Sequence, residues 1–187
     1  MEVLFHFVFE LVKIAILGCF YATLTLVLFA TLAYYQPRSL ADKVSQKPSR
    51  LWWVSGLIIS VALFFFMFTY WGNHGLGDIA RIPIGNFKTV GQINGTSTYI
   101  EKDNGKSVGV ESFAVNDNKL FAELDDYSEK GSYVIWNLET DKWYFYQTRN
   151  EYLKLAKRKN YPLPDTFKDF QQHYSDYWHG WRFFLLP

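Results

Sequence analysis

Three residues near the C-terminus have types and spacing that could bind a metal ion. His173, Asp176 and His179 follow one another at intervals of three, so a helix would place them on one side. A metal site usually needs three or four ligands at tight geometry, and the chain has no HExxH or similar signature. We therefore treat these residues as weak metal candidates and otherwise expect no metal and no cofactor.

Other catalytic patterns are missing from the sequence. There is no GxSxG, P-loop, GxGxxG or Cys/His pair, and the single cysteine, Cys19, excludes a disulfide framework and a Cys-based zinc site. Asp125, Asp126 and Glu129 could hold Ca²⁺ in a loop, but they lack EF-hand spacing and are typical of a solvated turn. A net charge of +1 does not indicate a nucleic-acid binder. The sequence therefore predicts a protein that is not an enzyme.

Aromatic residues make up 20% of the chain, too many for every one to lie on one buried face. In the KWYFYQ stretch (142–147) both faces of the expected strand are aromatic, so a helix covers the second face or that face is a contact surface. Tyr and Trp anchor protein interfaces, and flat aromatic rings also stack on sugars. The candidate surface for a partner or ligand comprises Trp143, Tyr144, Tyr146, Tyr177, Trp178 and Trp181.

Two long apolar runs predict membrane-spanning helices over about 12–35 and 51–71. A bilayer core of roughly 30 Å needs about 20 helical residues, so each run is long enough. The first run is too long for a cleaved signal peptide, and no basic residue precedes Lys13. Aromatic residues near the ends of the runs are expected at the headgroup level of the membrane. They are Tyr34, Tyr35, Trp52, Trp53, Tyr70 and Trp71.

The segment between the two runs, residues 36–50, carries the basic residues that predict the orientation. These are Arg38, Lys43, Lys47 and Arg50. The N-terminal flank offers only Lys13, and the flank after Trp71 offers Arg81 and Lys88. Because Lys and Arg in short loops favour the cytoplasmic side, we expect this loop in the cytoplasm and both termini outside.

Small residues in the two runs suggest how the helices pack. Ala30 and Ala33 of the first are expected at the depth of Gly56 and Ser60 of the second, where small side chains let backbones approach. A separate pair, Gly18 and Ala22, is expected to face bulky residues of the second helix. Either these residues are merely common in spans, or Gly18 and Ala22 form a docking face for another protein's helix.

A glycine-rich connector at 72–80 precedes an expected extracytoplasmic α+β domain at 81–187. Asn-Gly pairs at 94–95 and 104–105 favour type I′ hairpins, because such turns need positive φ at both central residues. Thr148 and Asp165 are expected to cap two helices, and the GWRFFLLP end is expected to be a strand or a segment on the sheet. Alternation predicts strands near 87–93, 97–102, 107–115, 119–124, 132–138 and 143–148.

The predicted fold class is therefore α+β: a two-helix transmembrane hairpin (1–71), then an antiparallel β-meander domain with two C-terminal helices. Our leading expectation is a non-catalytic accessory or scaffold subunit of an envelope complex, in a bacterial inner membrane. It would hold another membrane protein through the Gly18/Ala22 face and the aromatic surface. The alternative is an extracytoplasmic module, tethered by two helices, that binds or senses a glycan or other small ligand.

Overall fold

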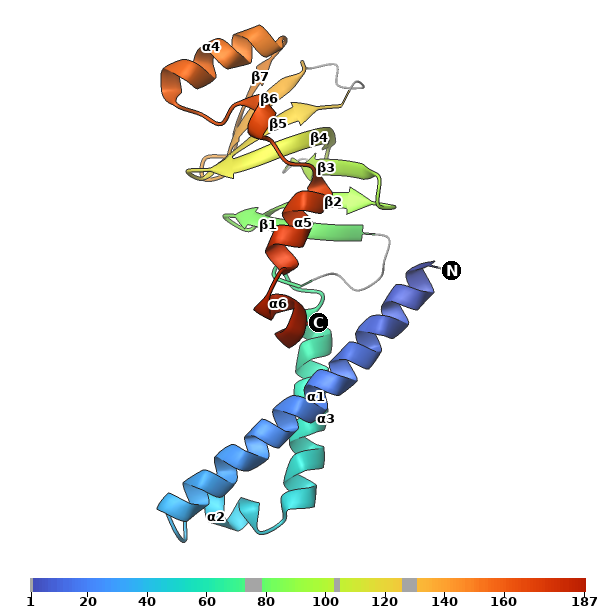
Figure 1. Cartoon of the computed structure of the whole chain (residues 1–187), viewed down its shortest axis with the longest axis vertical. Helices are drawn as coiled ribbons and strands as arrows, with labels where there is room; N and C mark the ends of the chain where they lie inside the picture. The colour runs from blue at the N-terminus through green and yellow to red at the C-terminus, as the bar shows by residue number, and fades with distance from the viewer. Residues whose placement is uncertain (1, 73–78, 103–104, 126–130) are drawn as a thin grey trace. The chain divides into compact units, whose positions relative to one another are not determined.

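The computed structural model describes residues 2–72, 79–102, 105–125 and 131–187, and within these ranges it omits the side chains of Glu2, Val3 and His6. It has helices, then a seven-stranded antiparallel sheet, then C-terminal helices (Figure 1), so the predicted α+β arrangement is confirmed. The chain divides into two compact units. The hairpin unit comprises Met1–Gly77 with Trp181–Pro187, and the sheet unit comprises Asp78–Gly180. Most of the predicted connector, residues 73–78, lies outside the described residues.

The hairpin unit contains two helices long and apolar enough to cross a membrane. These candidate spans are Phe7–Tyr35 and Pro48–Phe66, and no residue of the second is buried. Its exposed apolar side chains would be costly in water, so an apolar surrounding suits them better. The elements are α1 (Glu2–Tyr35), α2 (Leu40–Ser45), α3 (Pro48–Phe66) and α6 (Trp181–Leu185). The second helix is shorter than predicted: Met67 is its C-cap, so Tyr70 and Trp71 follow the helix.

Helices α1 and α3 pack through four small residues. A Cβ atom added at Gly18 would lie 2.1 Å from the Ser60 Oγ and 3.4 Å from the Gly56 carbonyl oxygen. A Cβ added at Gly56 would lie 3.4 Å from the Cβ of Ala22, which is itself fully buried. Gly18 and Ala22 therefore form the seam inside the hairpin, and the prediction that they offer a docking face to another protein was wrong.

The predicted partners of Gly56 and Ser60 were wrong for the same reason. Ala30 is exposed and Ala33 is only half-buried. The prediction assumed that the two runs end at the same depth beside the connecting segment. That segment, however, contains the helix α2. In addition, α1 is 34 residues long, roughly 51 Å. The contact between the helices therefore lies farther from the connecting segment than the lengths of the apolar runs indicate.

Replacing Gly18 by Val should destabilise the hairpin, because an isopropyl group must enter a contact that leaves no room even for a Cβ atom. Overpacking of this kind costs about 1–3 kcal/mol. The control is Ala30→Val, which adds the same side chain to an exposed position of the same helix. Thermal unfolding of the chain in detergent micelles should show a clearly lower midpoint temperature for Gly18→Val and an unchanged one for Ala30→Val. Equal midpoints for the two variants would contradict the seam.

The C-terminal segment belongs to the hairpin unit, so the prediction of a strand or a segment on the sheet was wrong. Residues Trp181–Leu185 form the short helix α6. The Tyr21 hydroxyl of α1 donates to the Leu185 carbonyl at 2.8 Å. The Lys13 Nζ lies 4.9 Å from the centroid of the Phe183 ring. The chain end is thus fastened to α1 by one hydrogen bond and one cation–π contact.

The sheet unit is a simple meander in which each strand pairs with the next along the chain. The six predicted strands are present, and one more, β1, precedes them. Sequence reasoning missed β1 because Pro83 and Gly85 look like strand breakers; Pro is nevertheless tolerated on an edge strand, which β1 is. The strands are β1 (Ile79–Gly85), β2 (Lys88–Ile93), β3 (Ser97–Glu101), β4 (Ser107–Asn116), β5 (Lys119–Leu124), β6 (Tyr133–Asn137) and β7 (Lys142–Tyr146).

The β2–β3 turn sets the register between these two strands. Asn94 and Gly95 both have positive φ, 54° and 68°, as the Asn-Gly pair predicts. The loop, however, has three residues, 94–96, because Ile93 pairs with Ser97. A two-residue type I′ turn would pair the strands one residue differently and reverse the faces of β3. In the next predicted hairpin, Asn104 lies outside the described residues.

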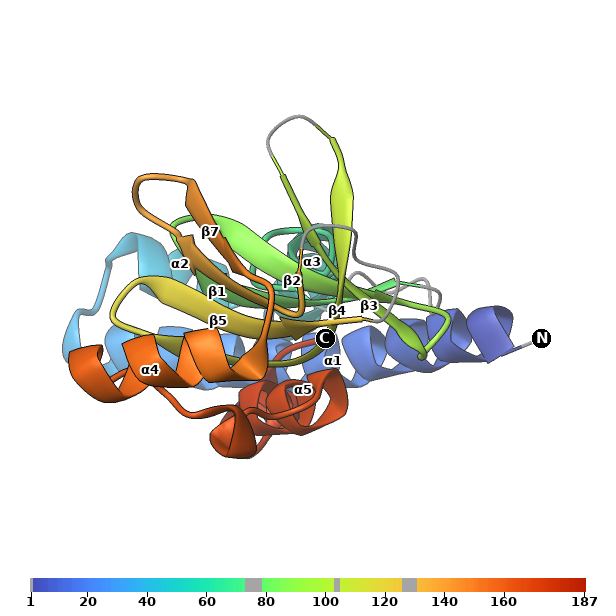
Figure 2. The same ribbon diagram turned by 90° about the horizontal axis from the view of Figure 1, so that it is seen from above.

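Two helices pack on this sheet, α4 (Arg149–Lys159) near β7 and α5 (Phe170–Trp178) near β1 and β4 (Figures 1 and 2). Helix α4 contributes Tyr152 and Ala156 to a core with side chains of β5 and β6, including Phe121. Helix α5 contributes Phe170 and Tyr174 to the core on the other face, built from all seven strands. A short 3₁₀ helix, Pro164–Thr166, lies between them in the chain.

The first predicted cap is confirmed and the second was wrong. The Thr148 hydroxyl accepts a hydrogen bond from the backbone N–H of Glu151, as expected for α4. Asp165 lies in the 3₁₀ helix instead of capping α5. Asp169 is the N-cap of α5, and it forms a capping box with Gln172. The Pro164 ring favours a separate turn here, which delays the start of α5.

Replacing Asp169 by Ala should therefore cost about 1 kcal/mol of unfolding free energy, because the first turn of α5 loses its side-chain acceptor. Asp165→Ala is the matched control. It removes an exposed pair with Arg149, and such pairs contribute about 0.5 kcal/mol or less in most exposed positions. Denaturation of the solubilised chain, followed by Trp fluorescence, measures both. A larger loss for Asp165→Ala would contradict the assignment of the cap.

Candidate ligand-binding groove

One face of the β1–β4 half of the sheet is not covered by α4 or α5. On the covered face, Ile82, Val90, Ile100 and Val110 lie in the core that includes Phe170 of α5. Neighbouring residues along a strand point to opposite faces, so Arg81, Gly91, Tyr99 and Gly109 lie on the other face. Helix α4 packs on this other face only farther along, over β5 and β6. The open face is therefore built by strands alone.

A row of paired residues crosses the open face from β1 to β4. Arg81 lies opposite Gly91, and Gly91 lies opposite Tyr99. Tyr99 lies opposite Gly109, whose carbonyl accepts a hydrogen bond from the backbone N–H of Asp125 at 3.4 Å. With strands about 4.8 Å apart, the four strands make this row roughly 14 Å long.

The two glycines let larger side chains lie flat on the sheet. A Cβ atom at Gly91 would come within 2.6 Å of the Tyr99 ring, and one at Gly109 would come within 1.9 Å of the Asp125 carboxylate. Any other residue at either position would displace these groups. The Tyr99 ring therefore rests with one side on Gly91, and the Asp125 carboxylate rests on Gly109, so both side chains form the floor of a shallow depression.

The depression is a groove of about 800 Å³, within the roughly 300–1,000 Å³ usual for small-molecule sites. Its lining combines an aromatic ring, hydroxyl groups, one guanidinium and three carboxylates. The lining residues are Arg81, Ile93, Thr96, Ser97, Thr98, Tyr99, Glu101, Gly105, Ser107, Gly109, Val110, Glu111 and Asp125. We call this surface the sheet groove.

The charged side chains of the sheet groove are not used to stabilise the fold. Arg81, Glu101, Glu111 and Asp125 form no side-chain hydrogen bond or ion pair within the parts of the chain that the structure describes. Arg81 lies at the β1 end of the row and Asp125 at the β4 end. The groove thus presents a donor at one end and acceptors at the other, all of them available to a ligand.

The three weak metal candidates are not brought together as ligands. The His173 Nε2 lies 2.8 Å from the Phe113 carbonyl oxygen, and its ring stacks on that of Phe113 at 4.0 Å. The Asp176 carboxylate accepts a hydrogen bond from the Lys168 Nζ at 2.7 Å. His179 is the C-cap of α5 with extended backbone, so it has left the helical side on which it was expected. Among the described residues, no three His, Cys, Asp or Glu side chains could share a metal ion.

Titration of these groups follows from their surroundings. Burial lowers the pKa of His173 below its ordinary value, and the hydrogen bond to Phe113 opposes that shift. The hydrogen bond from Lys168 lowers the pKa of Asp176. On the α4 side of the sheet, burial and the hydrogen bond to Glu123 raise the pKa of Tyr133 to about 12. None of these three groups lines the sheet groove.

Most of the six aromatic residues predicted to bind a partner belong to the core of the sheet unit. Trp143 stacks on Trp136 at 4.5 Å, Tyr146 packs beside Tyr152, and Tyr177 of α5 packs against the core of the sheet unit. Trp178 is only 7% exposed. Tyr144, in β7, and Trp181, in the other unit, are 51% and 61% exposed. On the second face of β7, α4 therefore covers Tyr146 but leaves Tyr144 exposed, so the helix alternative holds only in part.

The predicted interface and topology residues lie at the ends of α1 and α3. Tyr34, Tyr35, Trp53 and Trp71 are exposed. The Trp52 Nε1 instead donates to the Thr23 hydroxyl of α1 at 3.1 Å, so this indole links the two helices. The four basic residues of the connecting segment, Arg38, Lys43, Lys47 and Arg50, are all exposed.

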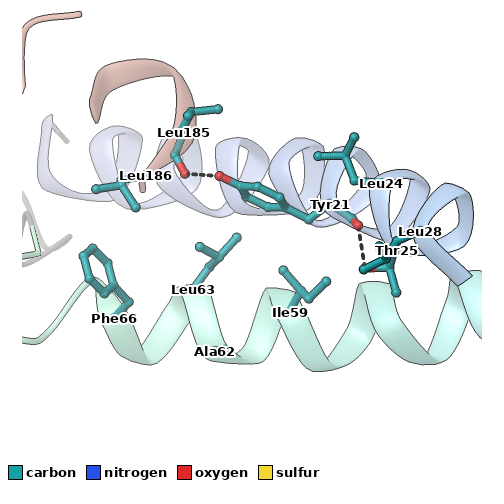
Figure 3. Close-up of a pocket in the computed structure, with 10 residues that line it drawn as sticks. All are labelled: Tyr21, Leu24, Thr25, Leu28, Ile59, Ala62, Leu63, Phe66, Leu185 and Leu186. Atoms are coloured by element: carbon teal, nitrogen blue, oxygen red, sulfur yellow. Dashed lines mark hydrogen bonds between the residues drawn. The ribbon is translucent and has the colours of Figure 1, made fainter. Parts of the chain in front are cut away.

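A second concavity, of about 500 Å³, lies in the hairpin unit between α1, α3 and the C-terminal residues (Figure 3). Its polar side chains are Tyr21 and Thr25, and their hydroxyls both donate to backbone carbonyls, of Leu185 and Tyr21, at 2.8 Å. Without an available polar group, this apolar cavity cannot fix the orientation of a ligand. The sheet groove is therefore the better candidate site.

The sheet groove was not found by reasoning from sequence. The sequence indicates Asp125 only as part of a possible Ca²⁺ loop with Asp126 and Glu129, and these two residues lie outside the described residues. The available signal was a glycine in the interior of two predicted strands, since Gly there often marks the close approach of another group. No family model, no curated protein and no solved structure matches this chain.

Proposed function

We propose that the protein is a membrane-anchored binding module whose sheet groove takes an uncharged, polyhydroxylated ligand such as a glycan. The observation that carries this proposal is the open row from Arg81 to Asp125, with Tyr99 lying flat at its centre. The two apolar helices of the hairpin unit support the anchor. The excess of Lys and Arg in residues 36–50 supports a cytoplasmic connecting segment and an extracytoplasmic sheet unit.

The charges of the groove decide the class of ligand. Three carboxylates, of Glu101, Glu111 and Asp125, disfavour an anion, and the Arg81 guanidinium disfavours a cation at its end of the row. Hydroxyl groups both donate and accept, so a sugar can use Arg81 and the carboxylates together. The free side of the Tyr99 ring can stack on the apolar face of a sugar ring. An uncharged glycan satisfies every one of these groups.

The experiment is a titration of the full chain in lipid nanodiscs, which avoids sugar-based detergents. The probes are cellohexaose, maltohexaose, xylohexaose and chitohexaose, with hexalysine and hexaglutamate as charged comparisons. At least one oligosaccharide should bind, with an affinity that hardly changes between low and high salt. Tyr99→Ala should weaken binding about tenfold or more, because it removes the stacking surface. Tyr99→Phe keeps the ring and should bind nearly as well as the native chain.

Tyr144→Ala is the control, since it removes an exposed tyrosine of the same sheet outside the groove. Oligosaccharide binding that is equally insensitive to Tyr99→Ala and Tyr144→Ala would contradict the assignment of the groove. Binding of hexalysine alone, weakened by salt and lost in Asp125→Asn, would keep the groove but overturn the glycan.

The accessory-subunit function, our leading expectation from sequence, remains a second proposal. The Gly18/Ala22 face no longer supports it, because that face is used inside the hairpin. The apolar cavity of Figure 3 supports it instead, since an apolar helix of another membrane protein could fill such a concavity. A stoichiometric membrane protein recovered with the tagged chain from a mild detergent would favour this function.

A further inference from the structure

The connecting segment of the hairpin unit forms a small cavity with two chemically different halves. Its volume is about 320 Å³. Lys43 of α2, Lys47 before α3 and Arg50 in the first turn of α3 line one part of it. Three aliphatic side chains complete the lining: Val44, Leu51 and Val54. We call this the corner cavity.

The three basic side chains of the corner cavity carry charge that the fold does not neutralise. Within the described part of the chain, no carboxylate forms an ion pair with Lys43, Lys47 or Arg50. Asp42 is the only acidic residue in 36–50, and its carboxylate accepts from the backbone N–H of Arg38 at 3.1 Å. Like charges converging on one cavity repel one another, so an anion seated there would relieve that repulsion.

The position of the cavity along α3 indicates what kind of anion it takes. Leu51 and Val54 lie in the first two turns of the candidate span Pro48–Phe66, where a spanning helix passes from headgroups into hydrocarbon. Lys43 and Lys47 precede the span. A free phosphate would use only the cations and would leave the aliphatic half of the cavity exposed to water. A phospholipid uses both halves, with its phosphate on the cations and the start of its acyl chains on Leu51 and Val54.

We propose that the corner cavity binds an anionic phospholipid of the leaflet on the side of the connecting segment. The basic residues that the positive-inside rule uses for orientation thus also form a specific headgroup site. This inference rests on α1 and α3 crossing a membrane and is independent of the sheet groove. Release of the chain from membranes by alkaline carbonate would overturn it while leaving ligand binding in the sheet groove intact.

The test uses the full chain in nanodiscs containing equal amounts of phosphatidylglycerol and phosphatidylcholine, analysed by native mass spectrometry after release. The native chain should retain phosphatidylglycerol in clear excess over phosphatidylcholine. The triple variant Lys43→Gln, Lys47→Gln, Arg50→Gln should reduce that excess at least tenfold, since each basic residue near a surface contributes to anionic-lipid binding. Leu51→Ser, which keeps every charge, should reduce retention of both lipids.

Two control variants distinguish binding in the corner cavity from non-specific electrostatic attraction between basic residues and anionic lipids. Arg38→Gln removes a basic residue of the same segment that does not line the cavity, and it should keep the excess. The charge-conserving variant Lys43→Arg, Lys47→Arg, Arg50→Lys should also keep most of it. An unchanged lipid ratio in the triple Gln variant, or an equal loss in Arg38→Gln, would overturn the proposal. Displacement of the bound lipid by millimolar inorganic phosphate would assign the cavity to a soluble anion instead.

Discussion

The arrangement of the sheet unit depends on a simple constraint: a meander sheet has two faces, and among the described residues of this unit only two α-helices pack on them. Helix α4 packs beside β5 and β6 on one face, and α5 packs beside β1 and β4 on the other. Burying apolar surface stabilises the fold by roughly 25 cal/mol for each Å² removed from water. The apolar side chains of the strands therefore lie on the faces that the helices cover. The uncovered half-face must be polar, and it is the one that carries Arg81, Tyr99 and Asp125.

Glycine makes this polar half-face concave. At Gly91 and Gly109 the backbone itself is the surface, and a ring and a carboxylate lie on it. The cost is conformational, because glycine inside a strand weakens the strand by roughly 0.5–1 kcal/mol relative to alanine. The three-residue turn at 94–96 determines that Gly91 lies opposite Tyr99 and not opposite the neighbouring Thr98 or Ile100. One turn residue more or fewer would move Tyr99 to the core face.

The elements of the fold can largely be predicted from sequence patterns that determine local structure. Alternation at β2 to β7, the cap at Thr148 and the apolar runs of α1 and α3 were all predicted from neighbouring residues. The groove was not, because it depends on pairing partners: the same Asn-Gly dipeptide fits a two-residue or a three-residue turn. The prediction of which residues pack between α1 and α3 was wrong for a similar reason. Gly18 contacts Ser60, and the lengths of the apolar runs do not determine that pairing. Trp143 and Trp178 were assigned to a surface because composition cannot tell which aromatic residues a helix will cover.

The sheet groove requires that the odd-numbered residues of β3 face outward on an open surface while the even-numbered ones face the core. Reaction with a maleimide measures this directly in the full chain, in nanodiscs and with Cys19→Ser as background. We predict that Ser97→Cys, on the groove side, reacts at least tenfold faster than Ile100→Cys. The native Ile100 side chain is fully buried in the core that includes Phe170 of α5. Similar rates, or slow reaction at Ser97→Cys, would contradict the register and with it the groove.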